Sequence, residues 1–294
     1  MTELKHTDTK AAAFREIDVE SLIASKNRNL ARLIPRFVIN YLKRTIHQDE
    51  INAAITQNQD KIGLSFIDKI LEIFGVNVET AGIENLDING RYLIASNHPL
   101  GGLDGMALMK VAGAVNPNIV FPVNDLLMNL PNLAPLFIPV NKHGSNSQNV
   151  KIMDETFASD KWMLYFPAGL CSRKQHGKIY DLEWKKSFIS KASKHKRDII
   201  PTYIDGKNSD FFYNLANIRK MLGIKANIEM LYLPDEMFNQ NSKTIRITFG
   251  KPIPWQTFDK RHTDAEWAGI MKEHVYAIGN SIDNFEALIN KGKS

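Results

Sequence analysis

The chain has 294 residues, of which 44% are hydrophobic and 23% are charged, and its formal net charge is +5. This length suits one large domain or a domain with an appendage, and the composition excludes fibrous, repetitive and disordered classes. A single cysteine, Cys171, excludes an intrachain disulfide framework and is interpreted as a small packing residue. The mild excess of basic residues suits an anionic surface or substrate, but no zinc spacing or RNA-binding signature indicates a nucleic-acid partner.

The first part of the chain predicts helices. Residues 1–15 are polar and lack the apolar core of a signal peptide, and no stretch of 18 apolar residues predicts a transmembrane helix. Apolar residues recur at helical spacing between Asp18 and His47, with a break expected near Pro35. A second helical stretch, Phe66–Phe74, completes an expected N-terminal unit of residues 1–75. Its basic amphipathic segment leaves two roles open, packing on the main domain or docking to lipid headgroups.

From residue 76 onward, short apolar runs alternate with helical segments. The runs predict strands at Tyr92–Ala95, Ile119–Val123, Phe137–Val140, Trp162–Phe166, Ile199–Ile204, Ile228–Leu233 and Ile245–Phe249. Helices are expected at Gly105–Val115, Asn149–Ser159, Lys185–Lys194 and 264–290. This alternation indicates an α/β fold over residues 76–294, with a central, mostly parallel or mixed sheet flanked by helices.

The segment from Asn97 to Asp104 carries the strongest chemical signal. An apolar run ends in Asn97-His98, and two glycines separate this pair from Asp104. Glycines permit positive φ and close backbone approach, so a tight turn can return the carboxylate to the imidazole. A neutral imidazole that donates its other ring proton to a carboxylate can act as a general base. These residues alone leave a second interpretation open, a buried core histidine with Asp104 capping a helix that starts at Gly105.

Three further blocks follow in order, and together with the first they carry a family resemblance. The blocks are Leu136–Lys142 (LFIPVNK), Tyr165–Arg173 (YFPAGLCSR) and Ile199–Ile204 (IIPTYI). With a lead-in at Val78–Leu86 and a closing strand at Ile247–Ile253, this order resembles the glycerol-3-phosphate and lysophosphatidate acyltransferase superfamily, in a divergent bacterial branch. The resemblance covers roughly residues 76–255.

The resemblance implies roles for individual residues. His98 would be the general base that deprotonates the acceptor as it attacks an acyl thioester, and Asp104 would orient the imidazole. The second and third blocks would bind the acceptor headgroup. The substrate-binding residues nominated in this way are Asn97, Lys142, Gly169, Ser172 and Arg173. We expect neither a metal nor a cofactor, because the acyl donor, acyl-ACP or acyl-CoA, is a co-substrate.

Departures from the family pattern bear on the acceptor. Five residues separate His98 from Asp104 where the family has four, and Ala168 stands where the family has a glutamate. Lys142 replaces an arginine. These changes indicate an acceptor other than plain glycerol 3-phosphate. Candidates are lysophospholipids and lyso-aminolipids, in which an amino acid carries a 3-hydroxy fatty acid as an amide.

The sequence therefore predicts a membrane-surface O-acyltransferase. Its expected partners are an anionic membrane surface, an acyl carrier protein or CoA thioester, and a lyso-lipid, and its expected place is the cytoplasmic face of the inner membrane. Two alternatives remain open, a non-catalytic lipid-binding member of the family and a thioesterase-like hydrolase that uses the same base on water.

Overall fold

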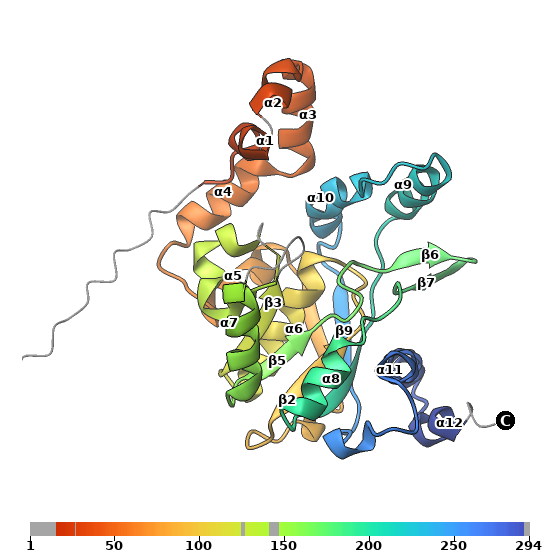
Figure 1. Cartoon of the computed structure of the whole chain (residues 1–294). Coiled ribbons are helices and arrows are strands. Elements are labelled where there is room, and N and C mark those ends of the chain that lie inside the picture. The colour runs from red at the N-terminus through yellow and green to blue at the C-terminus, as the bar shows by residue number, and fades with distance from the viewer. Residues whose placement is uncertain (1–15, 27, 125–126, 141–146, 291–294) are drawn as a thin grey trace, which may run out of the picture.

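The computed structural model describes residues 16–26, 28–124, 127–140 and 147–290 (Figure 1). Its α-helices are α1 (Val19–Lys26), α2 (Arg28–Leu33), α3 (Arg36–Thr45), α4 (Gln48–Gln57), α5 (Leu64–Ile73), α6 (Gly102–Val115), α7 (Ser147–Ala158), α8 (Ser187–Lys194), α9 (Asp210–Met221), α10 (Leu233–Phe238), α11 (Asp264–Gly279) and α12 (Phe285–Asn290). Its strands are β1 (Asn77–Ala81), β2 (Tyr92–Ser96), β3 (Ile119–Val123), β4 (Phe137–Pro139), β5 (Trp162–Tyr165), β6 (Arg173–Gln175), β7 (Lys178–Tyr180), β8 (Asp198–Ile204) and β9 (Thr244–Phe249).

Seven of the described strands form one sheet in the order β1-β9-β8-β2-β5-β3-β4, and β6 pairs with β7 as a separate hairpin. Neighbouring strands of the sheet are parallel except β8 and β9, which are antiparallel. The expected α/β class with a mostly parallel, mixed sheet is confirmed. Because parallel strands end at the same edge, the segments that follow β2, β5 and β8 meet there.

Alternate residues of β2 enter two different cores. Ile94 packs with α5 and α6 on one face of the sheet, whereas Leu93 and Ala95 pack with α8 and α11 on the other. All five residues of β2 are buried, as expected for a central strand covered by helices on both faces. The strand that precedes His98 is therefore held rigidly from both sides.

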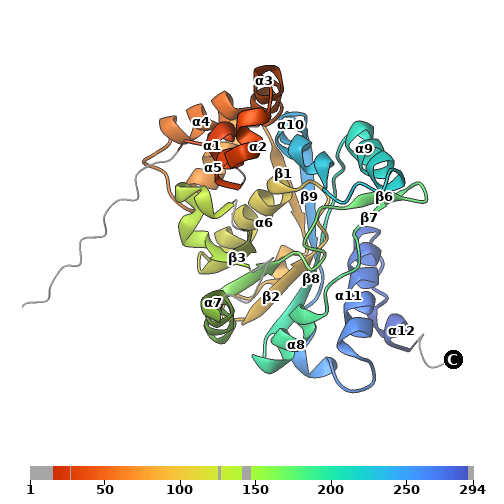
Figure 2. The same ribbon diagram turned by 45° about the horizontal axis from the view of Figure 1, so that its top comes forward.

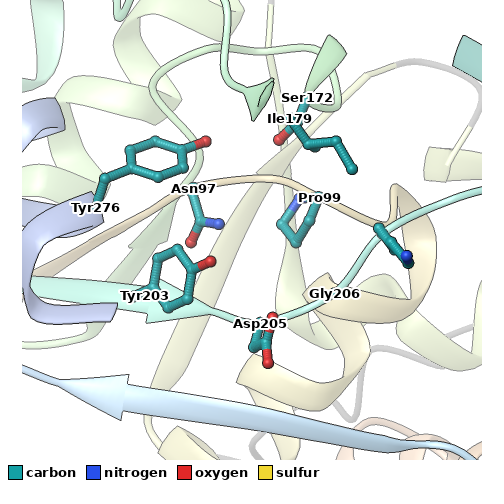
Figure 3. Close-up of a pocket in the computed structure, with 9 residues that line it drawn as sticks. Asn97, Pro99, Ser172, Ile179, Tyr203, Asp205, Gly206 and Tyr276 are labelled. Atoms are coloured by element: carbon teal, nitrogen blue, oxygen red, sulfur yellow. The ribbon is translucent and has the colours of Figure 1, made fainter. Parts of the chain in front are cut away.

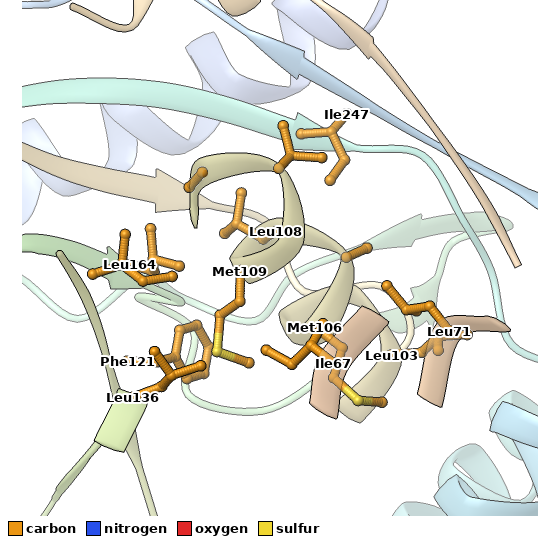
Figure 4. Packing of buried hydrophobic residues seen from close by; sticks show 14 of the residues in the cluster. Ile67, Leu71, Leu103, Met106, Leu108, Met109, Phe121, Leu136, Leu164 and Ile247 are labelled. Carbon is orange, nitrogen blue, oxygen red and sulfur yellow. The ribbon is translucent and has the colours of Figure 1, made fainter. Parts of the chain in front are cut away.

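The N-terminal helices divide into two groups. Pro35 is the N-cap of α3 and separates it from α2, at the break predicted from the sequence. Helix α5 contributes Ile67 and Leu71 to the core beside α6 (Figure 4). Helices α1, α2 and α3 lie away from the sheet, at the upper end of the molecule in Figure 1. None of the helices in the described ranges has the length and apolar character needed to cross a bilayer.

The strand predicted at Ile228–Leu233 is wrong. The segment forms a 3-10 helix, η4 (Ile228–Tyr232), which runs directly into α10. The buried side chain of Glu229 turns inward to two arginines, and Pro234 occupies the first turn of α10, where its fixed φ favours a helix start. A long-range ion pair and a local proline thus override an apolar run that is typical of a strand.

Candidate active site

The residue after β2 ties the end of this strand to β8. The Asn97 side-chain amide donates to the carbonyl of Ile204 at 2.9 Å, and its oxygen accepts the backbone N–H of Ile204 at 2.7 Å. Both amide groups are therefore used inside the protein. Asn97 was nominated to bind substrate, but its amide bonds to Ile204 and holds the end of β2, and so the start of the His98 loop, against β8.

The turn between His98 and α6 depends on two glycines. Gly101 has a φ of +83°, and a Cβ there would lie 3.0 Å from the side chain of Leu233 on α10. A Cβ on Gly102 would lie 3.1 Å from Sδ of Met237. The positive φ expected of these glycines is present at Gly101, where L side chains are strained. The close approach is present at both positions, where any side chain would have to displace a neighbour on α10 slightly.

Asp104 lies inside the first turn of α6 and is fully buried. The helix begins at Gly102, so Asp104 is not the cap of a helix that starts at Gly105, as the alternative interpretation required. Its Oδ2 accepts the N–H of Leu100 at 2.8 Å, and its Oδ1 accepts the N–H of Gly105 at 2.8 Å. These bonds fix both carboxylate oxygens in place.

The imidazole of His98 completes this arrangement. Its Nδ1 lies 3.0 Å from Oδ2 of Asp104, and the ring stacks on Phe166 at a centroid distance of 4.1 Å. An ionised carboxylate can only accept, so this contact assigns the ring proton to Nδ1 and leaves a lone pair on Nε2. Nε2 has no hydrogen-bond partner among the residues that the structure describes, and the side chain is 16% exposed. The geometry is that of an oriented base that a small acceptor can reach.

Asp181 joins the loop of His98 to the third block, and the sequence analysis missed it. Its Oδ1 accepts the N–H of His98 at 3.2 Å and the hydroxyl of Ser172 at 2.6 Å, while its Oδ2 accepts the indole N–H of Trp184 at 2.8 Å. The N–H of Ser172 also donates to the carbonyl of His98 at 2.7 Å. Asp181 lies 83 residues from His98, and no local pattern marks it.

The third block places Arg173 in a buried ion cluster. Its guanidinium lies 2.7 Å from Glu229 Oε1, and Glu229 is in turn 2.8 Å from Arg219. Arg173 also donates to the carbonyl of Cys171 at 2.5 Å. The side chain is almost fully buried, and Glu229 neutralises its charge. Arg173 therefore holds parts of the protein together and exposes little of its guanidinium.

The remaining motif residues vary in their accessibility. Gly169 is exposed, and a Cβ there would lie 3.2 Å from Nζ of Lys185, a cation that the sequence analysis did not nominate. Burial raises the pKa of the Cys171 thiol to about 11, which keeps it protonated at neutral pH and agrees with a packing role. Lys142 lies outside the described residues.

A cavity of about 270 Å³ opens behind the loop that carries His98 (Figure 3). Its lining residues are Asn97, Pro99, Ser172, Ile179, Tyr203, Asp205, Gly206, Lys207 and Tyr276. Lys207 is exposed and forms no ion pair with another described residue. Within the same described ranges, no three His, Cys, Asp or Glu side chains are grouped as a metal site requires.

Comparisons with known proteins identify the family. A family model described as "Acyltransferase" matches residues 21–285. Proteins named lyso-glycine lipid O-acyltransferase from Bacteroides thetaiotaomicron and Phocaeicola vulgatus are each 52% identical over 264 residues, covering 89% of this chain and 97% and 95% of theirs. The crystal structure of the 1-acyl-sn-glycerophosphate acyltransferase PlsC from Thermotoga maritima aligns with a TM-score of 0.46 and 14% identity, over 88% of this chain and 93% of that one. The chain belongs to the acyltransferase family and is an acyltransferase, as its four sequence blocks predict.

Proposed function

We propose that this acyltransferase transfers a fatty acyl chain from an acyl thioester to the hydroxyl of a lyso-glycine lipid, with His98 as general base. The contact between His98 Nδ1 and Asp104 Oδ2 carries the catalytic part of the proposal, because it leaves Nε2 free to accept a proton. The two relatives named for lyso-glycine lipid carry the choice of acceptor.

In the proposed reaction, His98 carries one proton from the acceptor hydroxyl to the leaving sulfur. Nε2 takes the hydroxyl proton as the acceptor oxygen forms a bond to the thioester carbonyl carbon. The tetrahedral intermediate then collapses, the C–S bond breaks, and the leaving sulfur takes the proton back from Nε2. Asp104 stabilises the imidazolium between these two transfers, and general-base assistance of this kind contributes about 10²–10⁴ in rate.

The headgroup blocks offer lysines, not a free arginine, to an anionic acceptor. Ala168 occupies the position of the family glutamate and packs in the core, while Arg173 is already neutralised by Glu229. Lys185 and Lys207 remain as exposed cations beside the third block and in the cavity, where each supplies a single point charge to an anionic headgroup.

The acyl donor and the place of reaction belong to the same proposal. Acyl-ACP and acyl-CoA are both water-soluble thioesters, whereas the lyso-lipid resides at a bilayer. The proposed place of reaction is therefore the surface of a membrane, at the cytoplasmic face of the inner membrane. Supplying the two thioesters separately at equal concentration distinguishes the donors.

Purified protein, a labelled acyl thioester and a panel of acceptors test the proposal. The panel contains an N-(3-hydroxyacyl)glycine, its methyl ester and a lysophosphatidate. We expect a diacyl product with the first, less with the ester, and little with lysophosphatidate. His98→Asn removes the base and should abolish product, while the same change at the exposed His176 in the β6–β7 turn should leave it unchanged.

The other outcomes separate the alternatives. Free fatty acid released at the same rate without any acceptor would identify a hydrolase. Retention of lipid with no product from any acceptor would identify a lipid-binding protein. Preferred acylation of lysophosphatidate would retain the chemistry and overturn the glycine-lipid acceptor.

A further inference from the structure

Exposed apolar side chains gather on one side of the molecule. Of fourteen large hydrophobic residues that are exposed within the described ranges, nine lie on α2, α3, α9, η4 and the turn that follows α9. These nine are Leu33, Phe37, Tyr41, Phe211, Ile218, Met221, Leu222, Ile224 and Leu231. Such a concentration on a soluble surface marks a docking site, because scattered single residues are the ordinary pattern.

The elements that carry these residues form a continuous wall. The hydroxyls of Tyr41 on α3 and Tyr232 on η4 lie 2.6 Å apart, and the ring of Phe211 on α9 meets the ring of Tyr232 at 4.9 Å. Figure 2 shows α3, α10 and α9 following one another along the upper side of the molecule. The wall stands beside the proposed active site, since Leu233 at the start of α10 contacts the turn at Gly101.

The end of α9 is the most protruding part of this wall. Met221 is 78% exposed and Leu222 is 64% exposed. Gly223, with a φ of +69°, reverses the chain so that Ile224 follows on the same tip, and the space around Gly223 is open. We name residues 218–225 the α9 tip. Its four large apolar side chains are between 40% and 78% exposed.

The charge left unpaired on the wall is mainly basic, because Asp210 at the start of α9 pairs with Lys174 and Asp235 on α10 lies 3.0 Å from His47. Residues 28–46 contain five basic residues and no acidic one, and residues 211–228 contain three basic residues and no acidic one. The basic residues exposed there without an ion pair to another described residue are Arg28, Arg32, Arg36, Arg44, Lys220 and Lys225. Pairing this face with a second copy of the chain would set like charges against one another, whereas a bilayer with anionic headgroups complements both the charge and the apolar tip.

We propose that the α9 tip inserts into an anionic bilayer surface and, with α2 and α3, docks the enzyme on the membrane through two separate apolar contacts. Met221, Leu222 and Ile224 enter the boundary between headgroups and acyl chains, and Lys220 and Lys225 contact the anionic headgroups. This inference rests on the membrane surface named in the proposed function and assigns the residues that make the contact. Docking is measured without donor or acceptor, so its failure is distinguishable from a failure of the proposed chemistry.

Co-sedimentation with phosphatidylcholine vesicles, with and without phosphatidylglycerol, tests the proposal on the full chain. Met221→Ser combined with Leu222→Ser should weaken binding about tenfold or more, since two apolar side chains no longer leave water. Lys220→Gln combined with Lys225→Gln should cost about fivefold per lysine on the anionic vesicles alone. The matched control is Ile88→Ser with Val150→Ser, which removes exposed apolar side chains elsewhere and should leave binding unchanged.

A fluorescent probe locates the contact directly. The native Cys171 is fully buried, so a thiol-reactive environment-sensitive dye on Leu222→Cys reports from the α9 tip. We expect a blue shift with anionic vesicles and none from the same dye on Ile88→Cys.

Two results would overturn the inference. One is full vesicle binding by the Met221→Ser, Leu222→Ser variant without a blue shift from the tip. The other is light scattering that shows a dimer which this variant dissociates. Activity on acceptor below its critical micelle concentration separates docking from chemistry, because the tip variant should keep that activity and the His98 variant should lose it.

Discussion

The first and third sequence blocks use their charged side chains in opposite ways. In the first, Asp104 is buried and satisfied on both oxygens, and Nε2 of His98 has no partner in the part of the chain that the structure describes. In the third, Arg173 and Glu229 neutralise one another inside the protein. The comparison teaches that a position in a catalytic motif does not by itself make a side chain available to substrate. The local contacts give Arg173 an anchoring position, and they leave His98 in the orientation that the proposed general base requires.

Asp104→Asn should produce the largest effect on activity. An amide stabilises neither the required tautomer nor the imidazolium, so we expect kcat to fall by about 10²–10⁴. We also expect a loss of roughly 1–3 kcal/mol in stability, because the N–H of Leu100 or of Gly105 loses its acceptor. Steady-state kinetics and thermal unfolding of the same preparation check this. Glu266→Gln, at the equivalent position in the first turn of α11, is the control for loss of a helix-start carboxylate. If both variants behaved alike, Asp104 would be structural only.

Glu229→Gln should instead produce a loss of stability. It leaves Arg173 and Arg219 buried without a counter-charge, which costs about 3–5 kcal/mol in the free energy of unfolding. Denaturant unfolding measures this, with Glu79→Gln as the control that breaks an exposed pair with Arg246. A stable variant with a changed KM for the acceptor would show that Arg173 contacts substrate after all.

Asp181→Asn sharpens the comparison, because Asp181 touches both blocks. The change removes one buried hydrogen bond, which costs roughly 1–3 kcal/mol, and His98 loses an anchor of its backbone. We therefore expect a lower kcat with an unchanged KM for the donor. Trp184→Phe removes only the contact to Oδ2 and serves as the control. Equal kcat values for the two variants would limit Asp181 to a packing role.

The smallest effect is expected at an exposed ion cluster. Hydrogen bonds from Lys194, then His195, then Lys191 hold the pKa of Asp154 well below its usual value of 3.8. Because the folded pKa is lowered, this contribution is present above about pH 4 and is lost as the pH falls through the folded pKa. Solvent screening limits it to about 1 kcal/mol or less. Thermal unfolding of Asp154→Asn should therefore differ slightly from the wild type at pH 7 and converge with it in acid, and a gap that persisted in acid would contradict this origin.

Local structure could be predicted from the sequence, whereas contacts between residues far apart in the chain could not. Periodicity placed Ile119–Val123 at its true bounds, and the break at Pro35 follows from the chemistry of proline alone. The glycines at 101 and 102 predicted the turn because φ is a local property. By contrast, Asp181 reaches His98 across 83 residues, and Arg173 meets Glu229 across 56. No spacing rule in the sequence identifies such partners. The third block could therefore be recognised, but the burial of Arg173 against Glu229 could not be predicted.

The contact between Gly101 and Leu233 has a consequence for how such enzymes can diverge. The turn and α10 are in close contact, since a Cβ at position 101 would lie 3.0 Å from the end of the Leu233 side chain and would push it aside. We therefore expect the five residues between His98 and Asp104 to change together with α10 when such enzymes diverge. A chimaera in which residues 98–104 are replaced by the segment of a relative with four residues between histidine and aspartate should be inactive. Transfer of α10 from the same relative should restore its activity.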